Sequence, residues 1–153
     1  RSLNTFVGLP HRYEIFLKRK NFTFINDSKA TSFQATKFAL QNTKNIFWIV
    51  GGLPKQNDRI NLKNLRTNII KSYIIGKNTS FFKKQIKNKI KHCVARNLRN
   101  SIIQILKDIK SLKEEKNIIL LSPAAASFDQ FKNFENRGNE FKKLSRLYAK
   151  KFI

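Results

Sequence analysis

Residues 97–112, NLRNSIIQILKDIKSL, decide the fold together with the apolar run KNIILLS at 116–122. The first segment repeats apolar residues at helical spacing, which places them in one stripe: Leu98, Ile102, Ile105, Leu106, Ile109 and Leu112. The second segment is short and continuously apolar, as is typical of a strand that is covered on both faces. An amphipathic helix followed by a covered strand indicates a sheet with helices packed against it.

The same alternation continues toward the N-terminus and the C-terminus. We expect a hairpin of two strands at 12–19 and 21–26, and further strands at 45–52, 72–76 and 92–95. Helical spacing predicts helices at 31–42, 60–69, 80–90 and 139–152, the first with Phe33, Phe38 and Leu40 near one side. The sequence therefore predicts an α/β fold with a doubly wound, mainly parallel sheet of about six strands flanked by helices.

The length and composition limit the kinds of protein that the chain can form. At 153 residues, we expect 1–153 to be a single domain. The single Cys93 excludes an intramolecular disulfide and fits a cytoplasmic protein. No run approaches the roughly 18 apolar residues of a membrane span, so we expect no membrane partner. The chain begins without a Met or a signal-peptide pattern, and we expect it to be a piece of a longer protein.

The net charge of +23 suggests nucleic acid or an anionic surface as a partner. However, the basic residues are spread along the chain, and the densest cluster, at 81–92, has the pattern of a solvated helix face. Neither a recognition helix nor an RNA-binding aromatic motif accompanies the charge. We therefore keep a basic nucleic-acid-binding module as an alternative and do not expect nucleic acid to be the partner.

The loop after the strand at 21–26 contains the first candidate site, because ligands of parallel sheets bind beyond the carboxyl ends of the strands. Asp27 or Ser28 stands where a helix N-cap belongs, and either side chain caps well. Lys29 would then lie in the first helical turn, where a cation opposes the helix dipole unless an anion binds there. The pattern leaves open a simple cap or an anion site.

The loop IVGGLPKQND at 49–58 is the second candidate. Gly51 and Gly52 permit a close backbone approach at the end of a strand, and Lys55 follows three residues later. The pattern G-x-x-x-x-G-K-[ST] occurs nowhere in the sequence, so the chain contains no P-loop.

The third candidate is SPAAASFDQFKNFENRGNEF at 122–141. Its three alanines permit a tight turn, in which Ser127 and free backbone N–H groups suit a carboxylate or phosphate. Ser127 or Asp129 could also cap the following helix. Phe128, Phe131 and Phe134 could pack in the core, and we expect at least one of them to do so.

His11 and Arg12 precede the first strand, in a turn that Gly8 and Pro10 set. A lone histidine is more often structural than catalytic, although the neighbouring Arg12 modestly favours a functional role for His11. The sequence has two histidines and one cysteine, and His11 stands far from His92 and Cys93, so we expect no metal centre.

Together these segments resemble the C-terminal domain of the bacterial muramyl ligases, most closely the members that add D-glutamate. The resemblance rests on GLPHR at 8–12, NDSKAT at 26–31, the glycine pair with Lys55, and the segment at 122–141, in the family's order and spacing. It extends over essentially the whole chain, although 56–116 contains no motif of the family. Family members often have Cys where Ala125 stands and Asn where Ser32 stands.

The resemblance implies a Rossmann-like domain that supplies the site of the incoming amino acid and part of the ATP site. It places lysine, hydroxyl and phenylalanine side chains around D-glutamate: Lys29, Thr31, Lys55, Ser127, Phe128 and Phe134. Arg12 would face the phosphates of ATP, and Asp27 its ribose. His11 would be the catalytic residue, near the muramoyl substrate and the reacting centre.

The resemblance further implies an ATP-dependent ligase of peptidoglycan precursor synthesis. ATP would phosphorylate the carboxyl group of UDP-N-acetylmuramoyl-L-alanine, and the amine of D-glutamate would attack the acyl phosphate. The family's N-terminal UDP-binding domain and central P-loop domain are absent from the sequence. We therefore expect those domains to hold Mg²⁺ and most of ATP, and the chain alone to be inactive. A domain that binds an amino acid without catalysis is a further alternative.

Overall fold

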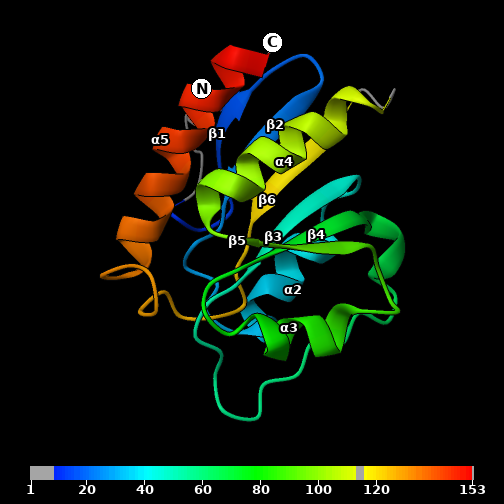
Figure 1. The fold of residues 1–153 in the computed structure, drawn as a ribbon, viewed down its shortest axis with the longest axis vertical. Helices are drawn as coiled ribbons and strands as arrows, with labels where there is room; N and C mark the ends of the chain where they lie inside the picture. Colours follow the sequence, from blue (N-terminus) through cyan, green and yellow to red (C-terminus); the bar gives the residue numbers. More distant parts are fainter. Residues whose placement is uncertain (1–8, 113–115, 153) are drawn as a thin grey trace.

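Within the described residues, six strands form one mixed sheet with helices on both faces (Figure 1). The computed structural model describes residues 9–112 and 116–152. In chain order the elements are β1 (Glu14–Lys18), β2 (Phe22–Asn26), α2 (Phe33–Gln41), β3 (Ile46–Gly51), η1 (Arg66–Asn68), β4 (Ile69–Ile75), α3 (Thr79–Ile86), β5 (His92–Arg96), α4 (Leu98–Lys110), β6 (Asn117–Leu121) and α5 (Phe134–Phe152). The expected α/β class and mainly parallel sheet are confirmed.

The strand order is β1-β2-β6-β3-β4-β5. β1 pairs antiparallel with β2, as expected for a hairpin, and all other pairs are parallel. After the edge strand β5, α4 returns the chain across the sheet, so that β6 lies between β2 and β3. The carboxyl ends of β2, β6 and β3 are therefore neighbours, although β6 follows the other two by many residues.

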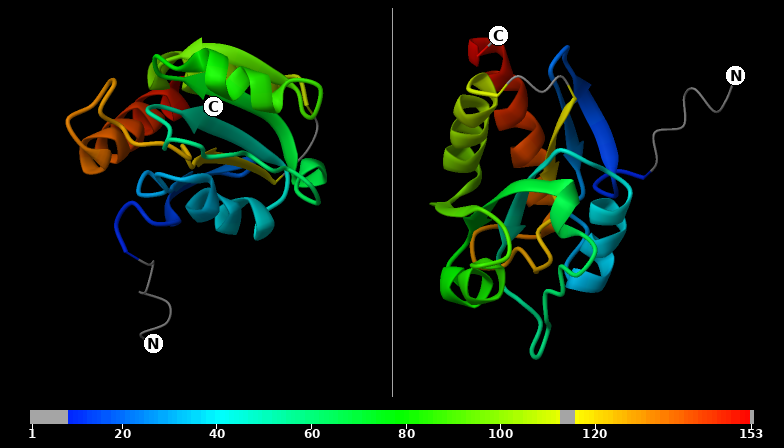
Figure 2. Two further views of the ribbon diagram at one scale, coloured as in Figure 1. Left: turned by 90° about the horizontal axis from the view of Figure 1, so that it is seen from below. Right: turned by 90° about the vertical axis from the view of Figure 1, so that its right-hand side faces the viewer.

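Two apolar layers hold the helices against the sheet. In one layer Phe47 of β3 packs with Ile102 of α4 and Phe141 of α5. The opposite layer includes Leu40 of α2 and Phe82 of α3. Figure 2 shows α4 and α5 on one side of the sheet and α2 on the other. Because helices cover both of its faces, β3 is buried along its whole length, which explains its continuous apolar sequence.

The segment 60–69 does not form the expected α-helix. Ile60, Leu62 and Leu65 are buried, but the chain makes only the short 3₁₀ turn η1 before it enters β4. Asn64 has a φ of 67°, a left-handed conformation that interrupts an α-helix. The apolar spacing reflected burial of an irregular segment, so the helix prediction was wrong.

Three further details differ from the sequence expectation. Phe38 of α2 is 60% exposed, because the buried side of this helix is formed by Phe33, Thr36, Ala39 and Leu40. Leu112 is 39% exposed, since α4 ends at Lys110, before it. α5 begins at Phe134, five residues before the expected start at 139.

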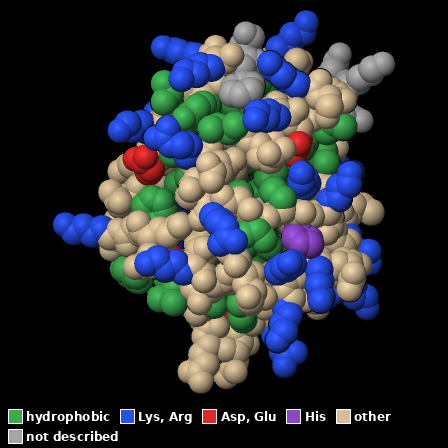
Figure 3. Space-filling view, viewed as in Figure 1, with side chains coloured by type: hydrophobic (Ala, Val, Ile, Leu, Met, Phe, Trp, Pro, Cys, Tyr) green, Lys and Arg blue, Asp and Glu red, His purple; other side chains and the backbone are tan. Residues whose placement is uncertain are grey.

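The positive charge is spread over the surface. Figure 3 shows Lys and Arg side chains scattered across the visible face, with few acidic ones between them. In the described part of the chain, two ion pairs form, Lys71–Asp108 at 2.9 Å and Lys142–Glu14 at 3.0 Å. None of the helices there is long and apolar enough to cross a membrane.

Candidate functional site

The loops that follow β2, β6 and β3 are joined by main-chain hydrogen bonds. The N–H of Asp27 donates to the carbonyl of Leu121 at 2.7 Å, and the N–H of Gly51 donates to that of Pro123 at 2.9 Å. The three candidate loops of the sequence therefore lie next to one another, as expected at the carboxyl edge of a parallel sheet.

Gly52 permits the contact between the loops after β3 and β6, whereas Gly51 permits a close approach to Ile75 of β4. Both have positive φ, 131° and 138°. A Cβ at Gly52 would overlap the carbonyl oxygen of Ala126. Leu53 and Ala126 then exchange hydrogen bonds of 2.8 and 2.9 Å. The expected close backbone approach is thus to the protein's own backbone.

Ala124, Ala125 and Ala126 form the alanine turn after β6, and fewer of its backbone N–H groups are free to bind an anion than the sequence suggested. Those of Ala124 and Ala126 donate to the carbonyls of Ala30, at 3.0 Å, and of Leu53, at 2.9 Å. The expectation of free N–H groups was wrong for these two residues. Phe128 does not pack in the core, since 67% of it is exposed.

The hydroxyl of Ser127 has no hydrogen-bond partner in the part of the chain that the structure describes. The residue is 2% exposed. Neither Ser127 nor Asp129 caps α5, because that helix begins at Phe134 and Asn133 accepts from the N–H of Asn136 at 2.7 Å. Buried polar atoms are usually hydrogen-bonded, so this hydroxyl is a candidate ligand-binding group.

The N-cap of α2 is Ser32, whose Oγ accepts from the N–H of Ala35 at 3.3 Å. The expectation of a cap at Asp27 or Ser28 was wrong. Lys29 lies before the helix, so the argument from the helix dipole fails for it.

Lys29 is exposed beside Phe134. Its Nζ lies 5.8 Å from the centre of the Phe134 ring, and its N–H donates to the carbonyl of His11 at 2.9 Å. No carboxylate of the described residues pairs with its ammonium group. Lys29 can therefore bind an anion without first breaking an ion pair.

His11 is buried beneath this loop, with a φ of 67°. Its Nδ1 lies 2.9 Å from Nδ2 of Asn26. That amide also donates to Glu14 at 3.0 Å, and its oxygen accepts from the N–H of Ser28 at 3.1 Å, which orients it. Nδ1 of His11 is therefore an acceptor. Burial lowers the pKa of His11 below its ordinary 6.5, so the imidazole is neutral near pH 7 with its proton on Nε2.

Arg12 and Asp27 line one cavity of about 350 Å³, together with Tyr13, Lys29, Ala30, Ala35 and Phe38. The carboxylate of Asp27 accepts from the N–H of Tyr13 at 2.9 Å and from the hydroxyl of Ser122 at 2.7 Å. Burial raises the pKa of Asp27 from 3.8 to about 6, although both hydrogen bonds and Arg12 favour the charged form. Lys29 thus borders both Phe134, as the resemblance implied, and this cavity, which the sequence did not indicate.

Within the described residues, the side chains of Thr31 and Lys55 make no hydrogen bond or ion pair with the other sequence-predicted residues. Thr31 is half-buried, directly before the cap of α2. Lys55 is exposed, and its side chain makes no hydrogen bond or ion pair within the described ranges. The main-chain pairing of Leu53 with Ala126 nevertheless keeps the loop of Lys55 next to the alanine turn.

Arg137 is the residue that sequence reasoning missed. It lies on α5 with 0% exposure and donates hydrogen bonds to Ser28 and to Ala125. In the sequence it stands among polar residues of a helix, which is the usual setting of a surface arginine. Its position within the long family-like segment was the one available signal.

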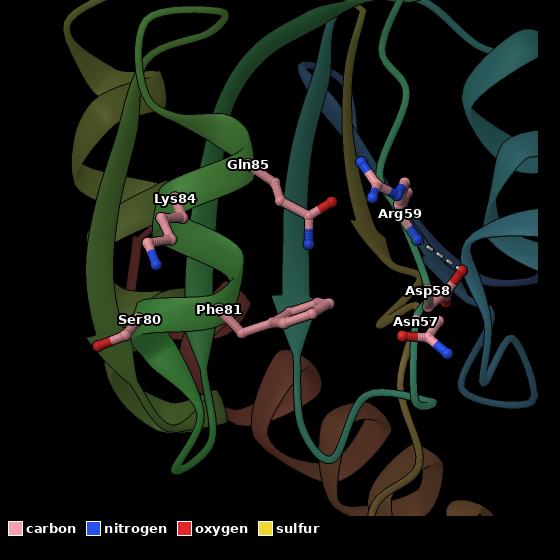
Figure 4. Close-up of a pocket in the computed structure, with 7 residues that line it drawn as sticks. All are labelled: Asn57, Asp58, Arg59, Ser80, Phe81, Lys84 and Gln85. Carbon is pink, nitrogen blue, oxygen red and sulfur yellow. Dashed lines mark hydrogen bonds between the residues drawn. The ribbon is translucent and has the colours of Figure 1, made fainter.

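A second cavity, of about 380 Å³, lies between the loop after β3 and α3 (Figure 4). Its lining contains none of the candidate residues: Asn57, Asp58, Arg59, Ser80, Phe81, Lys84 and Gln85. In Figure 4, Phe81 and Gln85 project from α3 toward the loop. The described residues contain no group of three or more His, Cys, Asp or Glu side chains that could hold a metal ion.

Curated proteins with similar sequences are ligases, whereas no protein-family model matches the chain. They include the UDP-N-acetylmuramoylalanine–D-glutamate ligases of Wolbachia sp. subsp. Brugia malayi, 42% identical over 141 residues, and of Nitrobacter hamburgensis, 38% identical over 146 residues. The matches cover 92% and 95% of this chain but 28% and 31% of those proteins. The chain therefore spans about a third of the length of these relatives.

Solved structures with a similar fold include crystal structure II of MurF from Acinetobacter baumannii, with a TM-score of 0.63 and 12% identity. It matches over 91% of this chain and 31% of that one. The MurF ligase from Thermotoga maritima in complex with ADP has a TM-score of 0.52 and 14% identity, over 93% and 33% of the two chains. At these identities the likeness concerns the fold.

Proposed function

Because this chain belongs to the Mur ligases, as their C-terminal region, we propose that it binds the incoming D-glutamate of a cytoplasmic ligase of peptidoglycan precursor synthesis. The identity to ligases named for D-glutamate supports the choice of amino acid. The observation that carries the proposal is the pair of unpaired groups in neighbouring loops, the ammonium of Lys29 and the buried hydroxyl of Ser127.

D-Glutamate has two carboxylates, and the site offers donors for both. Lys29 would bind one carboxylate, and Ser127 would donate its hydroxyl to the other. Thr31 would add a second hydroxyl, and Lys55 would add charge from the neighbouring loop. Phe134 lies against Lys29 and would form the wall of this pocket. Phe128, which is exposed beside Ser127, would close over the bound amino acid.

The cavity at Arg12 and Asp27 would receive part of ATP. Arg12 would face the phosphates, since a guanidinium binds phosphate oxygens in two parallel hydrogen bonds. Asp27 would accept hydrogen bonds from the ribose hydroxyls. In the family, Mg²⁺ and the remaining phosphate contacts come from a P-loop domain, and no P-loop pattern occurs in this sequence.

In the proposed reaction, ATP transfers its γ-phosphoryl group to the carboxylate of UDP-N-acetylmuramoyl-L-alanine, which gives ADP and an acyl phosphate. The amine of D-glutamate attacks the carbonyl carbon, phosphate leaves, and the nitrogen loses a proton. The chain contributes mainly by positioning D-glutamate and neutralising charge. His11, the proposed catalytic residue, has only Nε2–H available and would act as a hydrogen-bond donor.

The proposal is tested with the complete product of the gene that encodes this chain. In the presence of ATP, Mg²⁺ and UDP-N-acetylmuramoyl-L-alanine, D-glutamate should start phosphate release, and L-glutamate at the same concentration should not. The 153-residue chain alone should release no phosphate above background. Release that requires a different amino acid, or turnover by the isolated chain, would contradict the proposal.

A further inference from the structure

Arg137 is a fully buried cation that forms no ion pair with the described residues. It is 0% exposed, and no carboxylate of the described residues lies within ion-pair distance. Burial lowers the pKa of its guanidinium from 12.5 to about 10, with Asp129 opposing the change, so the group is charged near pH 7. Burying an unpaired charge is unfavourable unless hydrogen bonds satisfy it. Such a residue is expected to have a specific role in the structure.

The hydrogen bonds of Arg137 join three segments of the site. Its Nε donates to Oγ of Ser28 at 2.9 Å, and its Nη2 donates to the Ser28 carbonyl at 2.6 Å. Its Nη1 donates to the carbonyl of Ala125 at 2.9 Å. The hydroxyl of Ser28 in turn donates to the carbonyl of Phe134 at 2.7 Å. One planar group thus links the loop after β2, the turn after β6 and the first turn of α5.

Each linked residue is next to, or part of, the proposed amino-acid site. Ser28 directly precedes Lys29, and Ala125 stands two residues before Ser127. Arg137 donates its hydrogen bonds to Ser28 and Ala125 and to neither of those side chains, so it would act on a ligand through the placement of the two loops.

We propose that Arg137 is a positioning residue that sets the separation of Lys29 and Ser127, and thereby the fit of an amino acid with two carboxylates. This inference rests on the proposed function. A guanidinium holds its donors in a rigid fork, whereas a lysine offers a single ammonium group on a flexible stem. Charge alone is therefore insufficient, and Arg137→Lys should impair the site nearly as much as Arg137→Met.

The test measures steady-state kinetics of the complete gene product. Arg137→Lys should raise the KM for D-glutamate at least about tenfold while the KM for ATP changes less than about threefold. Ser28→Ala removes the hydroxyl that accepts the hydrogen bond from Nε of Arg137. This substitution should also raise the KM for D-glutamate, by a smaller factor. Because Ser28→Ala removes only one hydroxyl group, it still tests the inference if Arg137→Lys does not fold.

Leu144→Ala is the matched control, because Leu144 is buried on the same helix and packs in the core. It should lower thermal stability through a cavity and leave both KM values unchanged. An equal rise of the D-glutamate KM in this control would make the effect of Arg137 one of general stability. An unchanged KM in both Arg137→Lys and Ser28→Ala would overturn the inference outright.

Amide hydrogen exchange separates this inference from the proposed function. In Arg137→Lys, the N–H groups of Lys29 and Ala126 should exchange faster, because both hydrogen bonds depend on the placement of their loops. If the unsubstituted protein turns over no D-glutamate, the proposed function fails. Amide hydrogen exchange then still tests whether Arg137 holds the two loops in place. Unchanged exchange rates at both Lys29 and Ala126 would reject that role.

Discussion

A Cβ atom at Gly138 would overlap Nδ1 of His11 and lie 3.0 Å from Nδ2 of Asn26. In an open helix, alanine is more stable than glycine by about 1 kcal/mol. Here we expect Gly138→Ala to lower the free energy of unfolding by roughly 1–3 kcal/mol, since the crowded atoms must move. Urea unfolding of the chain measures the change.

The double variant His11→Ala/Gly138→Ala checks the cause. Removing the imidazole makes room for the new methyl group, so the Gly138 substitution should lose its destabilising effect in the His11→Ala background. Additive losses in the double variant would show that the overlap with His11 is not the origin.

The raised pKa of Asp27 predicts that the free energy of unfolding of the chain depends on pH. Because burial raises the pKa of Asp27 from 3.8 to about 6, the folded chain holds a proton that the unfolded chain releases between these values. The contribution of Asp27 to stability is therefore present below pH 4 and falls as the pH rises through about 6. The fall approaches about 3 kcal/mol at 1.36 kcal/mol per unit of pKa.

Asp27→Asn serves as the reference, since it cannot ionise. Urea unfolding of both chains at a series of pH values gives the difference between their free energies of unfolding. The unsubstituted chain should lose stability relative to the variant as the pH rises from 4 to 7. A constant difference over that range would disprove the raised pKa.

Lys29→Ala should raise the KM for D-glutamate in the complete gene product at least about tenfold, which corresponds to about 1.4 kcal/mol for one charged contact. Lys37→Ala removes an exposed lysine from α2 and should have no effect on that KM. A KM unaltered by the first substitution, or raised equally by both, would remove Lys29 from the site.

Ser127→Ala should weaken the binding of D-glutamate without lowering the free energy of unfolding. Because the Ser127 hydroxyl is buried without a partner, its removal should leave the free energy of unfolding unchanged or raise it by up to about 1 kcal/mol. The KM for D-glutamate should rise severalfold, because a ligand hydrogen bond is lost. Urea unfolding and steady-state kinetics measure the two effects.

Ser145 provides the matched control for this substitution. Its Oγ is also buried without a partner in the described part of the chain, on α5. Ser145→Ala should resemble Ser127→Ala in stability but leave the KM unchanged. If both alanine variants destabilise the chain by more than about 1 kcal/mol, the hydroxyls have partners and the argument for Ser127 is wrong.

The placement of the loops was predictable because it depends on local patterns and one general rule. β2, β3 and β6 appear in the sequence as short apolar runs, and parallel strands place their carboxyl ends at one edge. The cap of α2 and the start of α5 were mispredicted, because several side chains in each loop were able to cap and the backbone selects one.

By itself, the sequence determined the α/β class, the candidate loops and the family, since periodicity and motifs are properties of neighbouring residues. Only the tertiary structure decided that Arg137 is buried and that His11 accepts a hydrogen bond from Asn26. It also decided that the Ser127 hydroxyl is buried without a hydrogen-bond partner among the described residues. Burial and hydrogen bonding depend on which distant segments meet. Here they meet because β6 inserts between β2 and β3, which brings α5 against the loop of Lys29.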